Sequence, residues 1–216
     1  MSTIDLSTID TYMYRKKSPD TYCTLYRKYI NIVNICYNDY TISIYIERNH
    51  MSEDEIYMQL ALEKAHQAYA LDEVPIGAVI IYNGQVISAQ HNRRELDHDA
   101  TAHAEILAIQ EACRKLNRWR LTGCSLYVTI EPCPMCAGAI VNSRISRVIY
   151  GSSDYKGGAV ESLFNILTHP GLNHEPEIVS GILADECSQI MKRFFKERRK
   201  SRRSTQVAEG SALEMR

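Results

Sequence analysis

Two short segments of the sequence carry residue types that bind metal ions. The first, Glu131 to Cys136, places Cys133 and Cys136 three positions apart with Pro134 between them. Proline suits the first turn of a helix, so we expect both thiols near a helix N-terminus. The partial positive charge there lowers thiol pKa values and favours the thiolate that binds metal. This segment therefore predicts half of a metal site.

The second segment, Thr101 to Glu105, offers a further ligand. A structural zinc site normally takes four protein ligands, whereas one cysteine pair supplies two. His103 is the best candidate for a third ligand, and three ligands leave one coordination position open for water, as in a catalytic zinc site. At the first turn of a helix, Glu105 can reach that water and shuttle protons. Together the two segments predict a catalytic zinc centre.

Each segment by itself has an ordinary alternative interpretation. An isolated C-x-x-C in a cytosolic protein is also typical of a redox dithiol, although its usual setting is an early strand-to-helix turn of a thioredoxin-like unit. An isolated H-x-E on a helix is usually a pair of surface side chains. The two segments in this order, with both prolines, favour the metal site.

Composition excludes several classes of protein. The chain has 216 residues, 45% of them hydrophobic, which is enough to bury a core, and its net charge of -1 limits any nucleic-acid contact to a local basic patch. No apolar run approaches the roughly 18 residues of a membrane span, and the N-terminus lacks a secretory signal pattern. We therefore expect a cytoplasmic protein with no membrane contact. The cysteines outside the C-x-x-C pair are expected to be unpaired thiols, the last three of them in the core: Cys23, Cys36, Cys113, Cys124 and Cys187.

The elements that position the two segments follow from hydrophobic periodicity and turn signals. Ser52 and Glu55 have the spacing of a capping box at the head of a helix, and Asn83-Gly84 predicts a tight hairpin between two strands. Further helices are expected over Ala102 to about Leu116, from Pro134, and from about Ala184 to Lys200, and further strands over Ser125 to Ile130, Arg147 to Gly151 and Ile178 to Ser180. This alternation predicts an α/β domain with a mixed sheet.

The composition shifts twice along the chain. Residues 1–50 are rich in Tyr, Ile and Asn, and within them Tyr40 to Glu47 alternates weakly and can pair as a strand, but without a turn partner nearby. We expect an unpacked N-terminal extension over 1–50, a zinc domain over 51–200 and a disordered basic and polar tail over 201–216. Our leading hypothesis for the extension is a mis-assigned start, with the natural start at Met51. A regulatory arm is the alternative.

H-x-E followed by P-C-x-x-C is the motif of zinc-dependent nucleoside and nucleobase deaminases. The likeness extends to the stretches VPIGAVI, HNRRELDHDATAHAEILAI, LYVTIEPCPMCAGAIVNSRISRVIYG, SDYKGGA, HPGLNHEPEI, GILADEC and FFKERR. Over about residues 51 to 200 the sequence resembles the bacterial tRNA-specific adenosine deaminases of the cytidine-deaminase-like zinc superfamily. The resemblance implies a three-layer αβα cytidine-deaminase-like fold with a mixed central sheet, a homodimer, one zinc ion per subunit and the anticodon loop of a tRNA as partner.

The resemblance also implies roles for individual residues. His103, Cys133 and Cys136 hold zinc, and Glu105 shuttles protons while zinc-bound hydroxide attacks C6 of a flipped-out adenine, so that adenosine at the wobble position becomes inosine. The implied substrate-binding positions are Asn92, the backbone of Ala104, Asp154, Lys156, Asn173 and His174. Without the resemblance, Asn92 would be interpreted as a turn residue at the end of a strand.

A basic run close to the C-terminus is a candidate contact for phosphates. Lys192 to Arg203 contains eight Lys or Arg and one Glu, a net charge of +7. By itself such a run is most often a solvated helix face that ends in a disordered tail. Beside a deaminase site it favours an arm that contacts the tRNA backbone, with Lys196, Arg198 and Arg199 as the expected contacts.

Two other functions stay open from the sequence. A deaminase of a free nucleobase or nucleoside, of the cytosine or guanine type, would use the same zinc chemistry. A non-catalytic RNA-binding module stabilised by zinc would keep the metal and the basic run without turnover. The presence of Glu105 argues against the module, because a structural metal site needs no general base.

Overall fold

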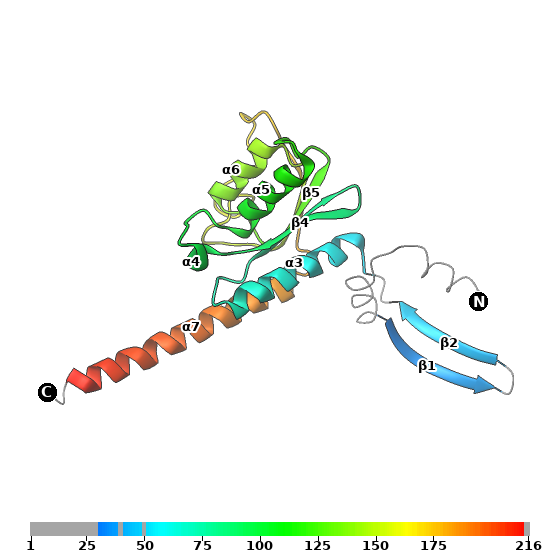
Figure 1. The fold of residues 1–216 in the computed structure, drawn as a ribbon, viewed down its shortest axis with the longest axis horizontal. Helices are drawn as coiled ribbons and strands as arrows, with labels where there is room; N and C mark the ends of the chain where they lie inside the picture. Colours follow the sequence, from blue (N-terminus) through cyan, green and yellow to red (C-terminus); the bar gives the residue numbers. More distant parts are fainter. Residues whose placement is uncertain (1–29, 39–40, 49–50, 214–216) are drawn as a thin grey trace. The chain divides into compact units, whose positions relative to one another are not determined.

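The computed structural model describes residues 30–38, 41–48 and 51–213, with side chains over 51–201. The chain divides into two units, residues 1–51 and 52–216. In the first unit, β1 (Ile30–Asn38) pairs antiparallel with β2 (Thr41–Arg48), as Figure 1 shows. The strand expected over Tyr40 to Glu47 corresponds to β2. Its partner β1 was missed because that segment has no regular alternation of apolar and polar residues. The expected domain boundaries stay predictions.

The second unit is built around a five-stranded sheet in the order β4-β3-β5-β6-β7. The strands are β3 (Gly77–Tyr82), β4 (Gln85–His91), β5 (Cys124–Ile130), β6 (Arg147–Ser152) and β7 (Glu177–Ser180). β3 pairs antiparallel with β4 and β5, whereas β5, β6 and β7 are parallel, so the predicted mixed sheet is confirmed. Asn83 and Gly84, with φ of 50° and 71°, form the tight turn expected between β3 and β4.

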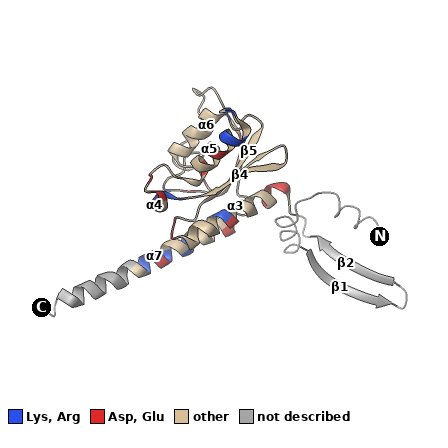
Figure 2. Cartoon of the chain, viewed as in Figure 1, with Lys and Arg blue, Asp and Glu red and all other residues tan. Residues whose placement is uncertain are grey.

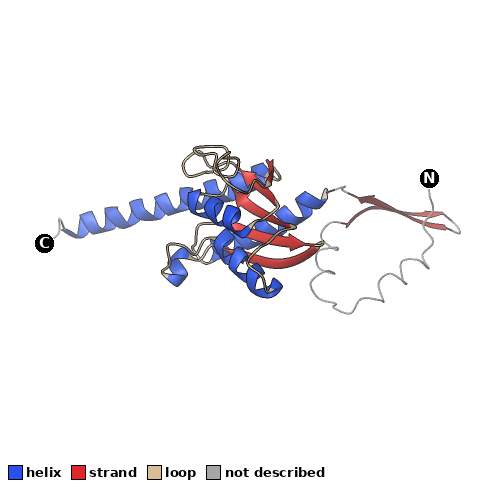
Figure 3. Cartoon of the chain, turned by 90° about the horizontal axis from the view of Figure 1, so that it is seen from above, coloured by secondary structure: helices blue, strands red, loops and turns tan. Residues whose placement is uncertain are grey.

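Helices cover both faces of this sheet (Figure 3). They are α3 (Glu53–Ala70), α4 (Arg94–Asp97), α5 (Ala104–Leu116), α6 (Pro134–Ser143) and α7 (Ala184–Leu213). Alternate residues of β3 point to opposite faces: Ala78 and Ile80 join the hydrophobic cluster that includes α5 and α6, and Val79 and Ile81 join the cluster of α3 and α7. The three-layer αβα architecture is therefore confirmed. The single turn α4 was not predicted, because it is too short to show a hydrophobic period.

The C-terminal helix α7 differs from its prediction. It was expected to end near Lys200 and to be followed by a disordered tail over 201–216, but the helix continues to Leu213. The continuation contains no proline and includes the helix formers Gln206, Ala208 and Glu209, so the helix can continue although Gly210 disfavours it. Although α7 has 30 residues, no helix in the described part of the chain is both long and apolar enough to cross a membrane.

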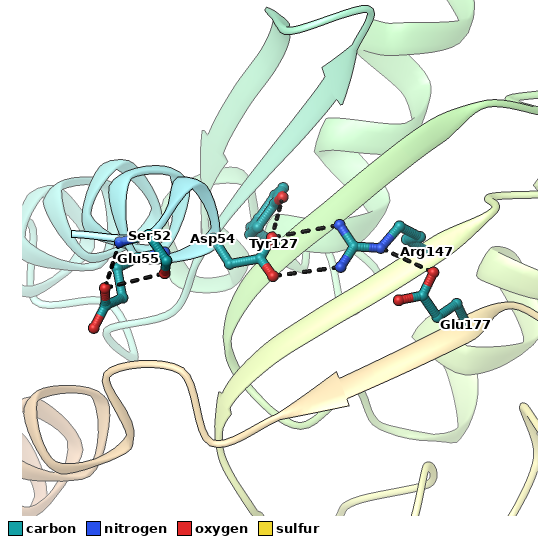
Figure 4. A network of polar contacts seen from close by, with 6 residues as sticks. All are labelled: Ser52, Asp54, Glu55, Tyr127, Arg147 and Glu177. Carbon is teal, nitrogen blue, oxygen red and sulfur yellow. Dashed lines mark hydrogen bonds and ion pairs between the residues drawn. The ribbon is translucent and has the colours of Figure 1, made fainter. Parts of the chain in front are cut away.

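Polar contacts join the start of α3 to three strands (Figure 4). Ser52 caps α3, and its reciprocal hydrogen bonds with Glu55 confirm the predicted capping box. The Asp54 carboxylate accepts a hydrogen bond from Tyr127 Oη at 2.7 Å on β5 and pairs with Arg147 on β6 at 3.3 Å. Arg147 also pairs with Glu177 of β7 at 3.1 Å. One partly buried guanidinium thus fixes α3 across the parallel half of the sheet.

Two glycines of this unit should respond oppositely to alanine. A Cβ at Gly151 in β6 would lie 2.4 Å from Cys187 Sγ and 2.7 Å from Thr129 O, whereas one at Gly138 in α6 meets nothing within 4 Å. Gly151→Ala should lower the free energy of unfolding by about 1–3 kcal/mol through overpacking. Gly138→Ala should raise it by up to about 1 kcal/mol, because alanine favours a helix. Urea titration measures both. Equal midpoints for the two variants would contradict the close packing of α7 on β6.

Candidate metal centre and active site

The first turns of α5 and α6 bring three metal-binding side chains together. His103 is the N-cap residue of α5, Cys133 is the N-cap residue of α6, and Cys136 lies in the first turn of α6 with Pro134 at its start. His103 Nδ1 lies 3.5 Å from Cys136 Sγ and 3.7 Å from Cys133 Sγ. The three ligand atoms all lie within 4.8 Å of one another. The two halves of the site predicted from separate segments thus converge.

The backbone explains this convergence. β5 leads through Glu131 and Pro132 directly into α6, so the cysteines stand just beyond the end of a central strand. The segment that carries His103 is held beside the end of β4, because Arg93 N donates a hydrogen bond to Ala102 O at 3.0 Å. α5 and α6 therefore begin at the same end of the sheet, just beyond the C-terminal ends of β4 and β5.

The chemistry of the three side chains fits a zinc ion. Hydrogen bonds from the Cys136 thiol and from His103, which outweigh the opposing effect of burial, lower the pKa of Cys133 to about 4. Its proximity to Cys133, together with burial, raises the pKa of Cys136. Two neighbouring thiols beside an imidazole nitrogen mark a place where a divalent cation would stabilise both thiolates. Two sulfurs and one imidazole nitrogen are ligands that zinc prefers.

Glu105 lies beside this cluster and is not part of it. Its side chain is 2% exposed, and burial raises its pKa. The side-chain atom Glu105 Oε2 has no hydrogen-bond partner among the described residues. A buried carboxyl oxygen without a partner is costly unless something else that binds at the site completes it. This arrangement suits a general base better than a metal ligand.

Asn92 lies immediately after β4 and is 2% exposed. Its Nδ2 donates a hydrogen bond to Glu73 Oε2 at 3.3 Å, and its Oδ1 has no partner among the described residues. Glu73 is completely buried and also accepts a hydrogen bond from Leu96 N at 2.8 Å. The position does end a strand, as the alternative interpretation expected, but its side chain is buried, which is unusual for a simple turn residue.

A third buried carboxylate, Glu131, holds the loop that carries Asp154 and Lys156. Burial acts to raise its pKa, but hydrogen bonds from Glu161, Ser162 and Asp154 outweigh this and lower the pKa to about 2. Asp154 N donates to Glu131 Oε2 at 3.0 Å, and Ala159 N donates to Pro132 O at 2.8 Å. The loop is therefore anchored to the residues that precede Cys133. Ala104, the other predicted substrate contact near the metal site, is the buried first residue of α5.

Asn173 and His174 lie elsewhere. Arg144 donates a hydrogen bond to Asn173 Oδ1 at 2.6 Å, and His174 Nε2 lies 2.6 Å from Ile145 O, which can only accept. These contacts are at the C-terminal end of α6. The cysteines are at its N-terminal end, about 15 Å away for a helix of this length. Within one chain the structure does not bring these two residues to the metal cluster, and their contact with tRNA stays a prediction.

Basic residues are spread along the described part of α7 (Figure 2), and their surroundings differ. Lys196 and Arg199 are exposed. The guanidinium of Arg198 donates to Asp72 O at 2.7 Å, pairs with Asp72 Oδ1 at 3.2 Å and lies 5.3 Å from the ring centroid of Phe194. Arg198 therefore attaches α7 to the end of α3, which makes it less available to a phosphate than the sequence suggested.

Sequence reasoning missed Glu73 and Glu131, the two buried carboxylates next to the site. A signal was present, because each stands at the edge of an apolar segment and within two residues of a proline, where a solvent-exposed acid would be out of place.

Residues 52–199 match the family model of the MafB19-like deaminases. The tRNA-specific adenosine deaminase of Bacillus subtilis (strain 168) is 49% identical over 154 residues, which cover 71% of this chain and 96% of that protein. The tRNA-specific adenosine deaminase of Agrobacterium fabrum (strain C58 / ATCC 33970) is 48% identical over 149 residues, 69% of this chain and 98% of that protein.

Solved structures give a consistent result. One structure, from a study of A-to-I editing by tRNA:A34 deaminases at the wobble position of transfer RNA, is 48% identical with a TM-score of 0.61 and covers 62% of this chain and 98% of its own. The guanine deaminase from Nitrosomonas europaea is 24% identical with a TM-score of 0.55, covers 67% of this chain and 85% of its own, and shares the fold.

The metal centre can be tested with two cysteine variants. Cys136→Ser should lose most of its bound zinc, because a hydroxyl is a poor zinc ligand, and its thermal midpoint should fall as metal-linked stability is lost. Cys113→Ser is the control, since Cys113 lies at the edge of the core outside the metal cluster, and a serine hydroxyl can keep its hydrogen bond to Trp119 O. Elemental analysis of the purified proteins measures the zinc-to-protein ratio. An unchanged ratio in Cys136→Ser would remove Cys136 from the ligand set.

Proposed function

The chain belongs to the family of tRNA-specific adenosine deaminases, and from this membership we propose that it converts adenosine to inosine at the wobble position of a tRNA. It is a hydrolytic deaminase that acts on tRNA. The observation that carries the proposal is the His103, Cys133 and Cys136 cluster beside a buried glutamate whose Oε2 lacks a partner among the described residues. That arrangement provides a metal site and a general base side by side.

His103, Cys133 and Cys136 would hold one zinc ion per subunit. When bound, the ion lowers the pKa of water and so supplies a nucleophile near neutral pH. The burial of Cys136 and the half-buried state of the other two ligands limit access of bulk water to the site, which strengthens every charge interaction within it.

Glu105 moves the protons of the reaction. Its carboxylate takes a proton from the attacking water and delivers it to the ring nitrogen N1, while the water oxygen bonds to C6 of adenine. Glu105 then takes the remaining proton from the new C6 hydroxyl and passes it to the exocyclic nitrogen, and breaking the bond between C6 and that nitrogen releases ammonia and leaves the C6 carbonyl of inosine. The raised pKa of Glu105 suits a group that must both accept and donate.

The remaining residues place the nucleotide. Asn92 and the backbone N–H of Ala104 would contact the flipped adenine, and the loop anchored by Glu131 would offer Asp154 and Lys156 to the anticodon loop. An anticodon loop already has unstacked bases, so flipping its target costs little. A homodimer and a location in the cytoplasm, where tRNA is modified, complete the proposal.

The alternatives are less well supported. The fold occurs in a guanine deaminase as well, so the fold alone does not select the substrate. Identity of 48% and 49% to tRNA-specific adenosine deaminases favours tRNA over a free base. A non-catalytic RNA-binding module would have no need to bury Glu105 beside a metal site.

The substrate is tested with unmodified tRNA that carries adenosine at the wobble position. We expect the zinc-loaded protein to form inosine at that position, measured by sequencing, and to leave free adenosine, guanine and cytosine unchanged. Deamination of a free base or nucleoside without inosine in tRNA would overturn the tRNA assignment.

The role of Glu105 is tested by one substitution. Glu105→Gln should lower kcat by about 10²–10⁴-fold and keep its zinc, because Glu105 is not a ligand. Loss of zinc in this variant would contradict the proton-shuttle role.

The basic face of α7 is tested by removing charge. Replacing Lys196 and Arg199 together by alanine should raise KM for tRNA and weaken its dependence on salt concentration, since phosphate contacts release counterions. The control is Arg114→Ala on α5, which removes an exposed charge on the opposite face of the sheet. Steady-state kinetics at two salt concentrations distinguish the variants. If Arg114→Ala and the α7 double variant change KM and its salt dependence by the same amount per charge removed, net charge alone accounts for binding.

A further inference from the structure

We propose that Glu73 is a positioning residue that fixes the orientation of the Asn92 amide and thereby presents Asn92 Oδ1 to a hydrogen-bond donor of the target nucleotide. The donor is a ribose hydroxyl or the exocyclic amino group. This inference rests on the proposed function for the nature of the substrate. The contact between Glu73 and Asn92 is independent of that function.

Glu73 connects three segments of the chain. Its backbone N–H donates to Ala68 O at 3.0 Å and so continues the end of α3. One carboxylate oxygen, Oε1, accepts from Leu96 N at 2.8 Å, and the other, Oε2, accepts from Asn92 Nδ2 at 3.3 Å. The side chain is completely buried. Each oxygen therefore has its own donor, and the two contacts can be altered separately.

The contact with Glu73 decides which way the Asn92 amide faces. A carboxylate only accepts hydrogen bonds, so the amide nitrogen must point toward Glu73 and the amide oxygen must point away. That oxygen is buried and has no partner among the described residues. A native protein rarely leaves a buried acceptor unpaired unless a ligand completes it.

The surrounding backbone leaves little other freedom at this position. Asn92 N donates to Ile76 O at 3.0 Å, and the next residue, Arg93, donates from its backbone to Ala102 O at 3.0 Å. Ala102 directly precedes His103, so the backbone next to Asn92 is bonded to the segment that carries the metal-binding histidine. The side-chain amide of Asn92 can still rotate, and its hydrogen bond to Glu73 fixes that rotation.

A purely structural role for Glu73 makes a different prediction. Holding α4 requires only the bond from Leu96 N to Oε1, whereas positioning requires the bond from Asn92 to Oε2. Glu73→Gln keeps an oxygen for Leu96 N and turns an amino group toward Asn92. Because that amino group only donates, the Asn92 amide must rotate and present its nitrogen to the nucleotide in place of its oxygen.

The test compares three variants by kcat/KM for inosine formation in tRNA. Glu73→Gln should lower kcat/KM by about tenfold or more, with zinc content retained. Asn92→Asp should also lower it, because two carboxylates then face each other. The double variant Glu73→Gln with Asn92→Asp restores a donor facing an acceptor and keeps an oxygen toward the nucleotide. Its kcat/KM should exceed that of either single variant.

Glu111→Gln is the matched control. Glu111 accepts from Ser88 Oγ at 2.7 Å and Gln90 Nε2 at 2.6 Å and pairs with Lys115 at 2.7 Å, so its replacement disturbs another hydrogen-bonded carboxylate, one for which no bond to Asn92 exists among the described residues. We expect its kcat/KM to equal that of the wild type. All assays are run below the thermal midpoint of every variant, because a rescue by the second substitution then cannot come from refolding.

An unchanged kcat/KM in Glu73→Gln, or a double variant no better than both single variants, would overturn the positioning role. Absence of inosine with the wild type would instead overturn the proposed function. In that event the Asn92 side-chain amide resonances decide the inference. Glu73→Gln should shift them and Glu111→Gln should not, and no shift in Glu73→Gln would refute it.

Discussion

α5 and α6 must begin side by side, since only then does His103 Nδ1 come within 3.5 Å of Cys136 Sγ. The requirement is met where the sheet changes from antiparallel to parallel pairing, because β5 pairs with β3 on one side and with β6 on the other. The parallel crossover from β5 through α6 to β6 forces α6 to start at the end of β5. Such a switch point is where α/β folds bind ligands.

Buried carboxylates and one buried amide surround this point. Their hydrogen-bonding atoms are satisfied in different ways. Glu131 is stabilised by backbone N–H groups, which lower its pKa and hold the loop of Asp154 and Lys156. Glu73 uses both oxygens as acceptors and orients Asn92. Glu105 keeps one oxygen without a partner among the described residues. Fully paired carboxylates are rigid supports, whereas an incompletely paired one is ready to exchange a proton.

The basic helix α7 stabilises the fold and also contributes positive charge to the surface. Tyr69 Oη donates to Glu197 at 2.5 Å, and Arg198 binds Asp72, so the polar side of α7 is attached to the end of α3. Asp72 directly precedes Glu73, which places this attachment next to the residue that orients Asn92. The cations that face solvent, such as Lys196 and Arg199, are the ones suited to phosphates.

The sequence by itself determined the parts that depend on neighbouring residues. Hydrophobic periodicity and turn chemistry located α3, the turn at Asn83-Gly84 and the strands, and the spacing of Cys133 and Cys136 identified a half-site because three positions along a helix define one face. β1, α4 and the extension of α7 beyond Lys200 were missed, because short or weakly patterned segments carry little periodic signal.

Only the tertiary structure decided which distant side chains meet. Asn92 and Glu73 are 19 residues apart, and Arg198 and Asp72 are 126 apart, so no local pattern relates them. In the packed domain Arg198 pairs with Asp72 and so stabilises the fold. Asn173 and His174 lie at the C-terminal end of α6, opposite the end that carries the cysteines. Hydrogen bonds of buried groups depend on the direction and distance of a partner, and these are fixed only when the layers of the domain pack together.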